Sequence, residues 1–377
     1  MILTNAVIID HEFKERRCDL SVLDERIAKI GEGLIGDEVL DLSGMYILPG
    51  FIDTHIHGAC GTRIGEKDAD LNKITCFEAT QGVTGIAITT GSSEYEGLFD
   101  DFEYAFKFSK QTHGAKILGI HAEGPFLNQK RKGAISPKVI IEPDVEKMEK
   151  LIEHGHGLLK IISIAPEVPG ALEAIAFASS KGVAVSMGHT DATYDEAMAG
   201  IQSGATEATH TFNAMRPYNH RDPGVLGAVL LSDEVTCEMI CDYVHLHPAT
   251  CKLIYQLKGA DHIRIISDSG HAAGANISQF EVNGMMRYVK DGVIRLADGT
   301  IAGSAKTMLD GVKNMLNAGI PMGDVAKMAS YNPAKTLKLD HITGSIVEGK
   351  CADLVVLDRN YDVVYTFVNG KCVYRAR

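Results

Sequence analysis

The sequence predicts an α/β protein, a (β/α)8 TIM barrel with a small β-sandwich domain formed by both chain termini. Apolar, β-branched runs alternate with amphipathic stretches between residues 49 and 339, and about eight such units imply a closed parallel barrel. No Gly-x-Gly-x-x-Gly follows the first strand, which disfavours an open doubly wound sheet. Residues 1–48 and 340–377 have a different pattern, with short strands joined by charged turns.

The strands and helices of the barrel are predicted from apolar spacing and from the turn residues that bound each run. The barrel strands are expected over residues 51–57, 85–90, 116–121, 160–165, 182–187, 207–211, 236–243 and 263–267. Amphipathic spacing predicts helices over 68–81, 96–112, 143–153, 170–180 and 194–203. Asn-Gly and Asp-Gly turns at 283–284 and 291–292 predict a β-hairpin insertion near 280–298. Terminal strands are expected over 1–10, 17–23, 26–30, 353–357, 363–368 and 371–374.

Composition limits the class of partner and the compartment. The net charge of −12 over 377 residues argues against nucleic acid or an anionic membrane as the main partner, but leaves room for an anionic small substrate. No apolar run approaches the roughly 20 residues that cross a bilayer, and the start lacks the pattern of a signal peptide. The eight cysteines are scattered, which favours reduced thiols in a cytoplasmic enzyme.

Histidines and carboxylates recur where the expected strands end. His55 and His57 alternate on one strand and therefore project from the same face. Any one of these residues could be a hydrogen-bonded core residue, but strand ends of a barrel meet at one mouth, so together they predict a metal site. The residues at these strand ends are His55, His57, Glu123, His189, His210 and Asp268. His121 is expected deeper in the barrel, buried and hydrogen-bonded, and His271 could reach the same mouth.

Such ligands suit one or two divalent ions of zinc, iron, manganese or cobalt. A catalytic metal lowers the pKa of a water molecule so that it becomes a nucleophile, and a neighbouring base must accept its proton. Asp268, on the last strand, is well placed for that role.

Several sequence motifs match a known family along essentially the whole chain. They are PGFIDTHIHG at 49–58, HAEGPFL at 121–127, GHT at 188–190, THTFNAM at 209–215, Asp268 and GTIAGS at 299–304. With them the chain resembles the amidohydrolase superfamily and, within it, the N-acetylglucosamine-6-phosphate deacetylases. The resemblance implies hydrolysis of N-acetyl-D-glucosamine 6-phosphate to D-glucosamine 6-phosphate and acetate.

The resemblance also implies roles for individual residues. Glu123, His189 and His210 would hold one metal, and His55 and His57 would hold a second together with Glu123, while Asp268 would be the general base and acid. Arg221 would reach the phosphate in the neighbouring subunit's site, which implies a homodimer. The remaining implied substrate contacts are Ala134, Asn213, Ala214, Asp242, His245, Ile301, Ala302 and Gly303.

One position departs from the family pattern. Ile135 stands where members often carry a polar residue, frequently histidine, that polarises the acetyl carbonyl. We hypothesise that a second metal at His55 and His57 takes over as Lewis acid. Three alternatives remain: the same chemistry on the galactosamine epimer, an amidohydrolase acting on a cyclic or N-acyl amide, and a non-catalytic sugar-phosphate sensor.

Overall fold

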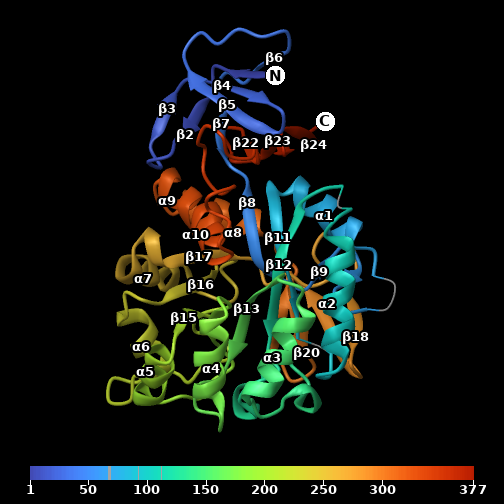
Figure 1. The fold of residues 1–377 in the computed structure, drawn as a ribbon, viewed down its shortest axis with the longest axis vertical. Helices are drawn as coiled ribbons and strands as arrows, with labels where there is room; N and C mark the ends of the chain where they lie inside the picture. Colours follow the sequence, from blue (N-terminus) through green and yellow to red (C-terminus); the bar gives the residue numbers. More distant parts are fainter. Residues whose placement is uncertain (67–68, 92, 112) are drawn as a thin grey trace.

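The computed structural model describes residues 1–66, 69–91, 93–111 and 113–377, and its centre is an eight-stranded parallel sheet (Figure 1). The sheet order is β17-β16-β15-β14-β13-β12-β11-β8, so each strand lies beside its neighbour in sequence. Its strands are β8 (Phe51–Ile56), β11 (Val83–Thr90), β12 (Lys116–Glu123), β13 (Leu159–Ile164), β14 (Ala184–Met187), β15 (Ala205–Ala208), β16 (Thr236–Ile240) and β17 (Ile263–Ile266). This arrangement confirms the predicted fold class.

The sheet closes between its first and last strands. Just beyond β17, the backbone amide of Asp268 donates to the carbonyl of His55 at 2.9 Å, and the amide of His57 donates to the carbonyl of Ser269 at 2.8 Å. The seam of the barrel therefore passes through three of the residues predicted to form the site.

Helices cover the outside of the barrel. They are α1 (Leu71–Thr80), α2 (Gly97–Phe108), α3 (Val145–His154), α4 (Ala171–Ser180), α5 (Tyr194–Gln202), α6 (Gly224–Leu231), α7 (Pro248–Lys258), α8 (Met308–Asn317), α9 (Met322–Ala326) and α10 (Asn332–Thr336). Shorter helical turns lie at Gln129–Arg131, Pro137–Val139 and Ala260–His262, and a π-helical turn at Lys327–Tyr331. The predicted helix ends at Asp68 and Thr112 lie outside the described residues.

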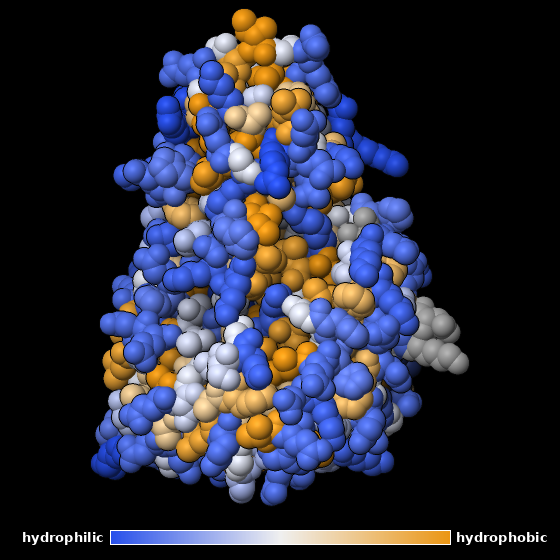
Figure 2. All heavy atoms as spheres, viewed as in Figure 1, coloured by the Kyte–Doolittle hydropathy of each residue, from blue (hydrophilic) through white to orange (hydrophobic). Residues whose placement is uncertain are grey.

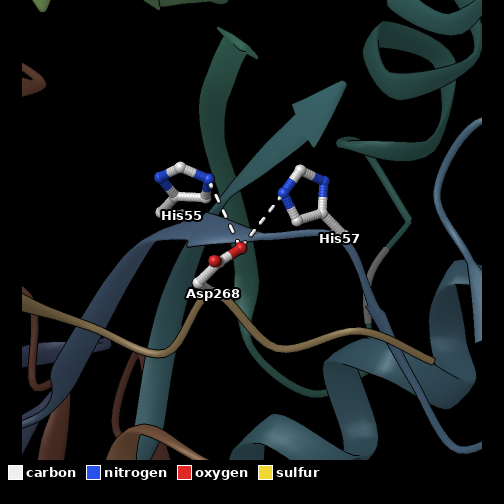
Figure 3. Close-up of side chains that lie close together, drawn as sticks. All are labelled: His55, His57 and Asp268. Atoms are coloured by element: carbon white, nitrogen blue, oxygen red, sulfur yellow. Dashed lines mark ion pairs between the residues drawn. The ribbon is translucent and has the colours of Figure 1, made fainter. Parts of the chain in front are cut away.

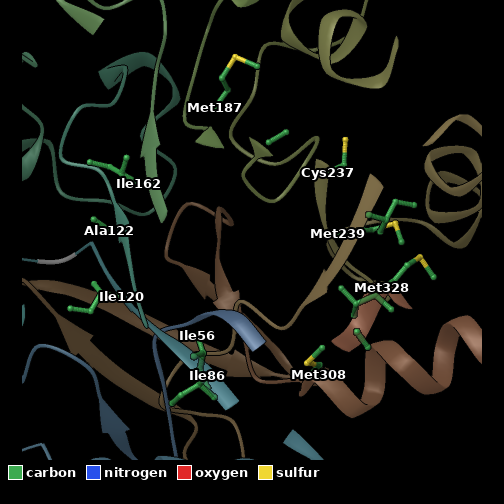
Figure 4. Packing of buried hydrophobic residues seen from close by; sticks show 14 of the residues in the cluster. Ile56, Ile86, Ile120, Ala122, Ile162, Met187, Cys237, Met239, Met308 and Met328 are labelled. Carbon is green, nitrogen blue, oxygen red and sulfur yellow. The ribbon is translucent and has the colours of Figure 1, made fainter. Parts of the chain in front are cut away.

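Alternation along the strands separates an apolar outside from a polar inside. Ile120 and Ile162 point outward into the main hydrophobic cluster, as Figure 4 shows. Their neighbours His121 and Ser163 point into the barrel, where the imidazole Nε2 and the hydroxyl lie 2.8 Å apart. The inward positions are thus free to carry chemistry while the outward positions supply the packing.

Two further sheets lie at one end of the molecule, one with strands from both ends of the chain and one with N-terminal strands alone (Figure 1). A six-stranded sheet has the order β24-β23-β22-β7-β2-β3, and a four-stranded sheet has the order β5-β4-β1-β6. Their strands are β1 (Ile2–Thr4), β2 (Val7–Ile9), β3 (Glu15–Arg17), β4 (Asp19–Leu23), β5 (Arg26–Gly31), β6 (Val39–Asp41), β7 (Tyr46–Pro49), β22 (Leu354–Leu357), β23 (Val363–Val368) and β24 (Lys371–Arg375). Side chains of both sheets, among them Leu3, Leu20 and Phe367, form one buried cluster.

The single strand expected over residues 1–10 is wrong. Asn5, with φ of +63°, breaks it into β1 and β2, which belong to different sheets. Asparagine adopts this left-handed conformation more readily than most residues. Strands β3, β6 and β7 were not expected as separate elements. The division of the chain into domains at residues 48 and 340 stays a prediction.

A four-stranded antiparallel sheet follows the last barrel strand. It consists of β18 (Gln279–Val282), β19 (Met285–Lys290), β20 (Val293–Leu296) and β21 (Ile301–Ser304), in that order. The first three strands occupy the segment expected as a hairpin, and β21 adds a fourth. This sheet lies beside the barrel, away from the terminal sheets (Figure 1). Two short strands, β9 (Gly58–Ala59) and β10 (Thr62–Arg63), follow β8.

The surface in Figure 2 is mostly hydrophilic, with hydrophobic residues in small groups and along the middle of the face shown. Among the helices of the described residues, none is long and apolar enough to span a bilayer.

Candidate active site

Glu123, at the end of β12, stands at the centre of four imidazoles. Its Oε1 lies 3.0 Å from Nε2 of both His189 and His210. Its Oε2 lies 3.3 Å from Nε2 of His57, and Nε2 of His55 lies 3.5 Å from Oε1. The Glu123 carboxylate therefore contacts His55 and His57 from one strand, and also His189 and His210, which follow two other strands.

Asp268 faces the first histidine pair from the end of β17. Its Oδ1 lies 3.2 Å from Nε2 of His57 and 3.6 Å from Nε2 of His55, and both rings point toward it from one strand (Figure 3). Burial alone would raise the pKa of Asp268, but the hydrogen bond from His57 and the charge of His55 outweigh it and lower the pKa to about 2. Asp268 is therefore an ionised carboxylate, able to accept a proton.

The donor atoms of this cluster fit a divalent metal. Nδ1 of His189 lies 2.9 Å from the carbonyl oxygen of Arg131, so this nitrogen carries the proton. Nε2 of a neutral ring then carries a lone pair, which faces the Glu123 oxygen at 3.0 Å. Two hydrogen-bond acceptors at this distance repel each other unless a cation lies between them. Nε2 of His55 is likewise buried without a hydrogen-bond partner among the described residues.

The electrostatics agree with a cation site. Burial would lower the pKa of His55, but the carboxylates of Glu238 and Glu123 raise it well above its ordinary value. Burial would also lower the pKa of His57, yet hydrogen bonds to Asp268 and Glu123 raise it to about 9. The surrounding carboxylates therefore favour positive charge at these two rings, which is the charge that a divalent ion would supply.

A buried ionic network beneath the cluster orients His55. Nδ1 of His55 lies 3.0 Å from Oε2 of Glu238, whose Oε1 accepts from Arg264 at 3.1 Å. Arg264 is fully buried and also pairs with Glu207 at 3.1 Å and donates to Thr54 Oγ1 at 2.6 Å. Such outer partners fix the ring and tautomer of a ligand histidine.

His121 does not extend the metal cluster, although it lies beside His55 and Glu238. Its Nδ1 faces the carbonyl of Thr54 at 3.1 Å and its Nε2 faces the hydroxyl of Ser163 at 2.8 Å. Burial lowers the pKa of His121 to about 3, so the ring is neutral. Both nitrogens are engaged, and His121 has the buried, hydrogen-bonded place expected from the sequence.

A cavity of about 430 Å³ opens above the cluster. The predicted site residues that line it are His57, Glu123, Ala134, His189, His210, Asn213, Ala214, His245, Asp268, Ile301, Ala302 and Gly303. His55 lies below the cavity floor and is wholly buried. The strand ends thus converge on one chamber, as the barrel topology requires.

Asp242 and Arg221 are not among the described residues that line this cavity. The carboxylate of Asp242 lies 2.8 Å from Nδ1 of His245 and accepts from the hydroxyl of Ser304, so it positions His245. Arg221 is exposed in a turn closed by hydrogen bonds between Asn219 and Asp222.

The cavity also contains cationic residues that were not predicted. Arg63 follows β8 on the short strand β10, and Arg287 lies on β19. Lys130 and Arg131 line the cavity as well, and both pair with Asp191. Nothing in the spacing of these residues pointed to the site, because they lie on loops and on the added sheet rather than at barrel strand ends. His271, for which the sequence left a place at the mouth open, lines the cavity.

Three functional residues have unusual backbone conformations. His189, His210 and Asp268 have φ angles of +48°, +29° and +48°. Non-glycine residues seldom adopt the left-handed region, and such conformations cluster at functional sites. Each of the three turns its side chain into the mouth immediately after its strand ends.

Comparison with known proteins identifies the family. Residues 46–373 match the model described as "Amidohydrolase family".

The chain belongs to the amidohydrolase family.

The similarity to known relatives extends over nearly the full length of this amidohydrolase. It is 35% identical to N-acetylglucosamine-6-phosphate deacetylase from Lysinibacillus sphaericus, over 98% of this chain and 97% of the relative. It is 30% identical to N-acetylgalactosamine-6-phosphate deacetylase from Escherichia coli O157:H7, over 93% and 95%. The solved N-acetylglucosamine-6-phosphate deacetylase from Thermotoga maritima has a TM-score of 0.91 at 34% identity and covers 100% of both chains.

The number of metal ions in this amidohydrolase can be tested by removing one histidine pair. Replacing His55 and His57 with Asn should lower the metal content by one ion per chain, because Glu123, His189 and His210 form a separate group of ligands. Elemental analysis of the purified variant measures this. The exposed His341, replaced by Asn, is the control. Unchanged turnover with one ion fewer would contradict the hypothesis that a second ion replaces the carbonyl-polarising residue missing at Ile135.

Proposed function

We propose that the protein hydrolyses the acetamide of N-acetyl-D-glucosamine 6-phosphate to D-glucosamine 6-phosphate and acetate. The observation that supports it most is the single cluster in which Glu123 joins four histidines beside Asp268, on the floor of a cavity of sugar-phosphate size. Relatives that bear this activity in their names match the chain from end to end.

The residues divide the chemistry between them. Glu123, His189 and His210 would hold one metal ion, and His55 and His57 with Glu123 would hold a second. Bound metal would supply a Lewis acid for the acetyl carbonyl. Asp268 accepts a proton from the attacking water and then passes it to the leaving nitrogen as the C–N bond breaks. Asn213, Ala214, His245 and the segment from Ile301 to Gly303 bind the sugar phosphate. The metal is zinc, iron, manganese or cobalt.

The substrate is tested with a coupled assay for acetate release. We expect turnover of N-acetylglucosamine 6-phosphate and little turnover of the dephosphorylated sugar. The galactosamine epimer is the second candidate, because the Escherichia coli O157:H7 relative is named for it. A higher kcat/KM on the epimer would transfer the assignment to that sugar. Equal turnover of the sugar with and without its phosphate would favour an amidohydrolase that acts on another amide. Binding of the sugar phosphate without any turnover would favour a sensor.

We also propose a homodimer in which Arg221 binds the phosphate in the neighbouring site. Its guanidinium suits a phosphate, and its exposed turn lies outside its own cavity. Mixing Arg221→Ala with Asp268→Asn chains should restore activity, because in the mixed dimer the Arg221→Ala chain keeps Asp268 and receives the partner's arginine. Random exchange should recover about a quarter of the wild-type sites. Activity no higher than the sum of the two parents would contradict action across the dimer.

We propose a cytoplasmic location. The scattered spacing of the eight cysteines, which are free thiols in the structure, supports it.

A further inference from the structure

One wall of the cavity carries an arginine pair that the proposed reaction does not use. Arg63 and His271 come from segments that are hydrogen-bonded to each other: the amide of Gly61 donates to the carbonyl of His271 at 2.8 Å, and that of Cys60 donates to the carbonyl of Ala273 at 2.7 Å. The His271 ring lies edge-on to Phe280 of β18, with centroids 3.8 Å apart. Arg287 of the neighbouring strand β19 lines the same wall.

The arginines on this wall have few direct partners in the part of the chain that the structure describes. Lys130 and Arg131, elsewhere in the cavity, pair with Asp191 at 2.5 and 2.6 Å. Among the described residues, Arg63 forms an ion pair with Glu66 alone, at 3.3 Å. The side chain of Arg287 donates a long hydrogen bond, 3.4 Å, to the carbonyl of Ala302.

The Nε of Arg287 is buried and has no hydrogen-bond partner among the described residues. Burial and the nearby charge of Arg63 lower the pKa of Arg287, and the carboxylates of Asp268 and Glu123 oppose this shift. Burial also lowers the pKa of His271, so the imidazole adds a neutral donor or acceptor rather than another charge. Two guanidinium groups that line one cavity, one of them with a buried Nε–H that has no partner among the described residues, are suited to an anion.

The position of the wall indicates which part of a substrate meets it. An amide bound at Glu123 and Asp268 has an amine side and an acyl side. The proposed function assigns the amine side, with its sugar phosphate, to Asn213, Ala214 and His245, which follow β15 and β16, and to the segment from Ile301 to Gly303. Arg287 donates to the carbonyl of Ala302 and therefore lies between the two sides. Arg63 and His271 follow β8 and β17, on a separate part of the rim, and are left to face the acyl side.

We propose that Arg63 and Arg287 form a carboxylate subsite on the acyl side of the scissile amide. The subsite would accept N-acyl groups that end in a carboxylate, such as a succinyl group, in addition to acetyl. Hydrolysis is then balanced as for acetyl: the water oxygen bonds to the acyl carbon, the C–N bond breaks, the nitrogen takes a proton, and a dicarboxylate leaves. The assignment of the acyl side rests on the proposed function.

Binding of free acids tests the subsite without requiring turnover. Succinate and acetate are titrated calorimetrically into the metal-loaded protein. Succinate has a second carboxylate for the arginines, so it should bind at least about tenfold more tightly than acetate. Arg63→Gln and Arg287→Gln should each abolish this preference. Lys290→Gln removes an exposed charge from the same strand as Arg287 and should keep it.

Turnover distinguishes the subsite from the proposed function. Wild-type enzyme should hydrolyse both N-acetyl- and N-succinyl-glucosamine 6-phosphate, and Arg287→Gln should lower kcat/KM about tenfold or more only for the succinyl compound. Equal binding of succinate and acetate, or a preference that survives both arginine substitutions, would overturn the proposal. A loss in Arg287→Gln that is equal for both compounds, with lost discrimination against the dephosphorylated sugar, would instead place the sugar phosphate on this wall and would also overturn it. If neither sugar phosphate is hydrolysed, the proposed function fails, while the succinate titration still decides the subsite.

Discussion

Asp268→Asn should lower kcat by about 10²–10⁴-fold, which is the usual contribution of a positioned general acid and base. Asparagine keeps the size of the side chain but cannot accept the proton of the attacking water. The ion held by Glu123, His189 and His210 should stay bound, because that ligand group does not include Asp268, although Asp268 also lies with His55 and His57 in a second possible ligand group. Acetate release and elemental analysis on the same sample measure both quantities.

The matched control is Asp261→Asn, which removes an exposed carboxylate that pairs with Lys327 at 2.8 Å on the surface. It should retain wild-type kcat. An Asp268→Asn enzyme that turns over near the wild-type rate with full metal would assign the base to another residue. A variant that loses both metal and activity would make Asp268 a ligand rather than the base.

Arg264→Met should destabilise the protein by about 3–5 kcal/mol, because it leaves buried carboxylates without their partner. Arg264 is fully buried and lies 3.1 Å from both Glu207 and Glu238, and the burial of those two side chains is nearly complete. Urea unfolding of metal-free protein measures the effect without a contribution from bound ions. Lys327→Met, which breaks a surface ion pair, should cost at most about 1 kcal/mol.

A second substitution separates the charge effect from packing. In the Arg264→Met variant, a second substitution, Glu238→Gln, removes one of the two buried carboxylates left without a cation. It should recover part of the lost stability. Glu238→Gln alone should weaken metal binding about 10–100-fold, because His55 loses the carboxylate that orients its ring. Additive losses in the double variant would show that the two side chains do not act as a pair.

The sequence predicts the barrel well because its signals are local and repeated. Each parallel strand is an apolar run followed by polar residues, and the topology of a barrel brings every such end to one mouth. This rule alone predicts that Glu123, His189, His210 and Asp268 lie close together, although Glu123 and Asp268 are 145 residues apart in the chain. The outward isoleucines, such as Ile120 and Ile162, carry the same periodic signal.

Other features depend on contacts that have no such signal. Arg63 and Arg287 reach the cavity from a short strand pair and from an added sheet, so neither lies at a barrel strand end. The network of Glu207, Glu238 and Arg264 is inside the barrel, where a charged residue in an apolar run gives no sign of its partner. Asn5 divides one apolar run between two sheets through its backbone angle alone.

The left-handed backbone at His189, His210 and Asp268 limits which amino acids these positions can accept over evolution. Asparagine, aspartate, histidine and glycine tolerate that conformation, whereas a β-branched residue there costs about 1–3 kcal/mol in strain. Homologues that have lost the catalytic activity should therefore carry asparagine or glycine at these positions more often than other residues. The same restriction makes asparagine the substitution that removes the chemistry while leaving the strand ends in place.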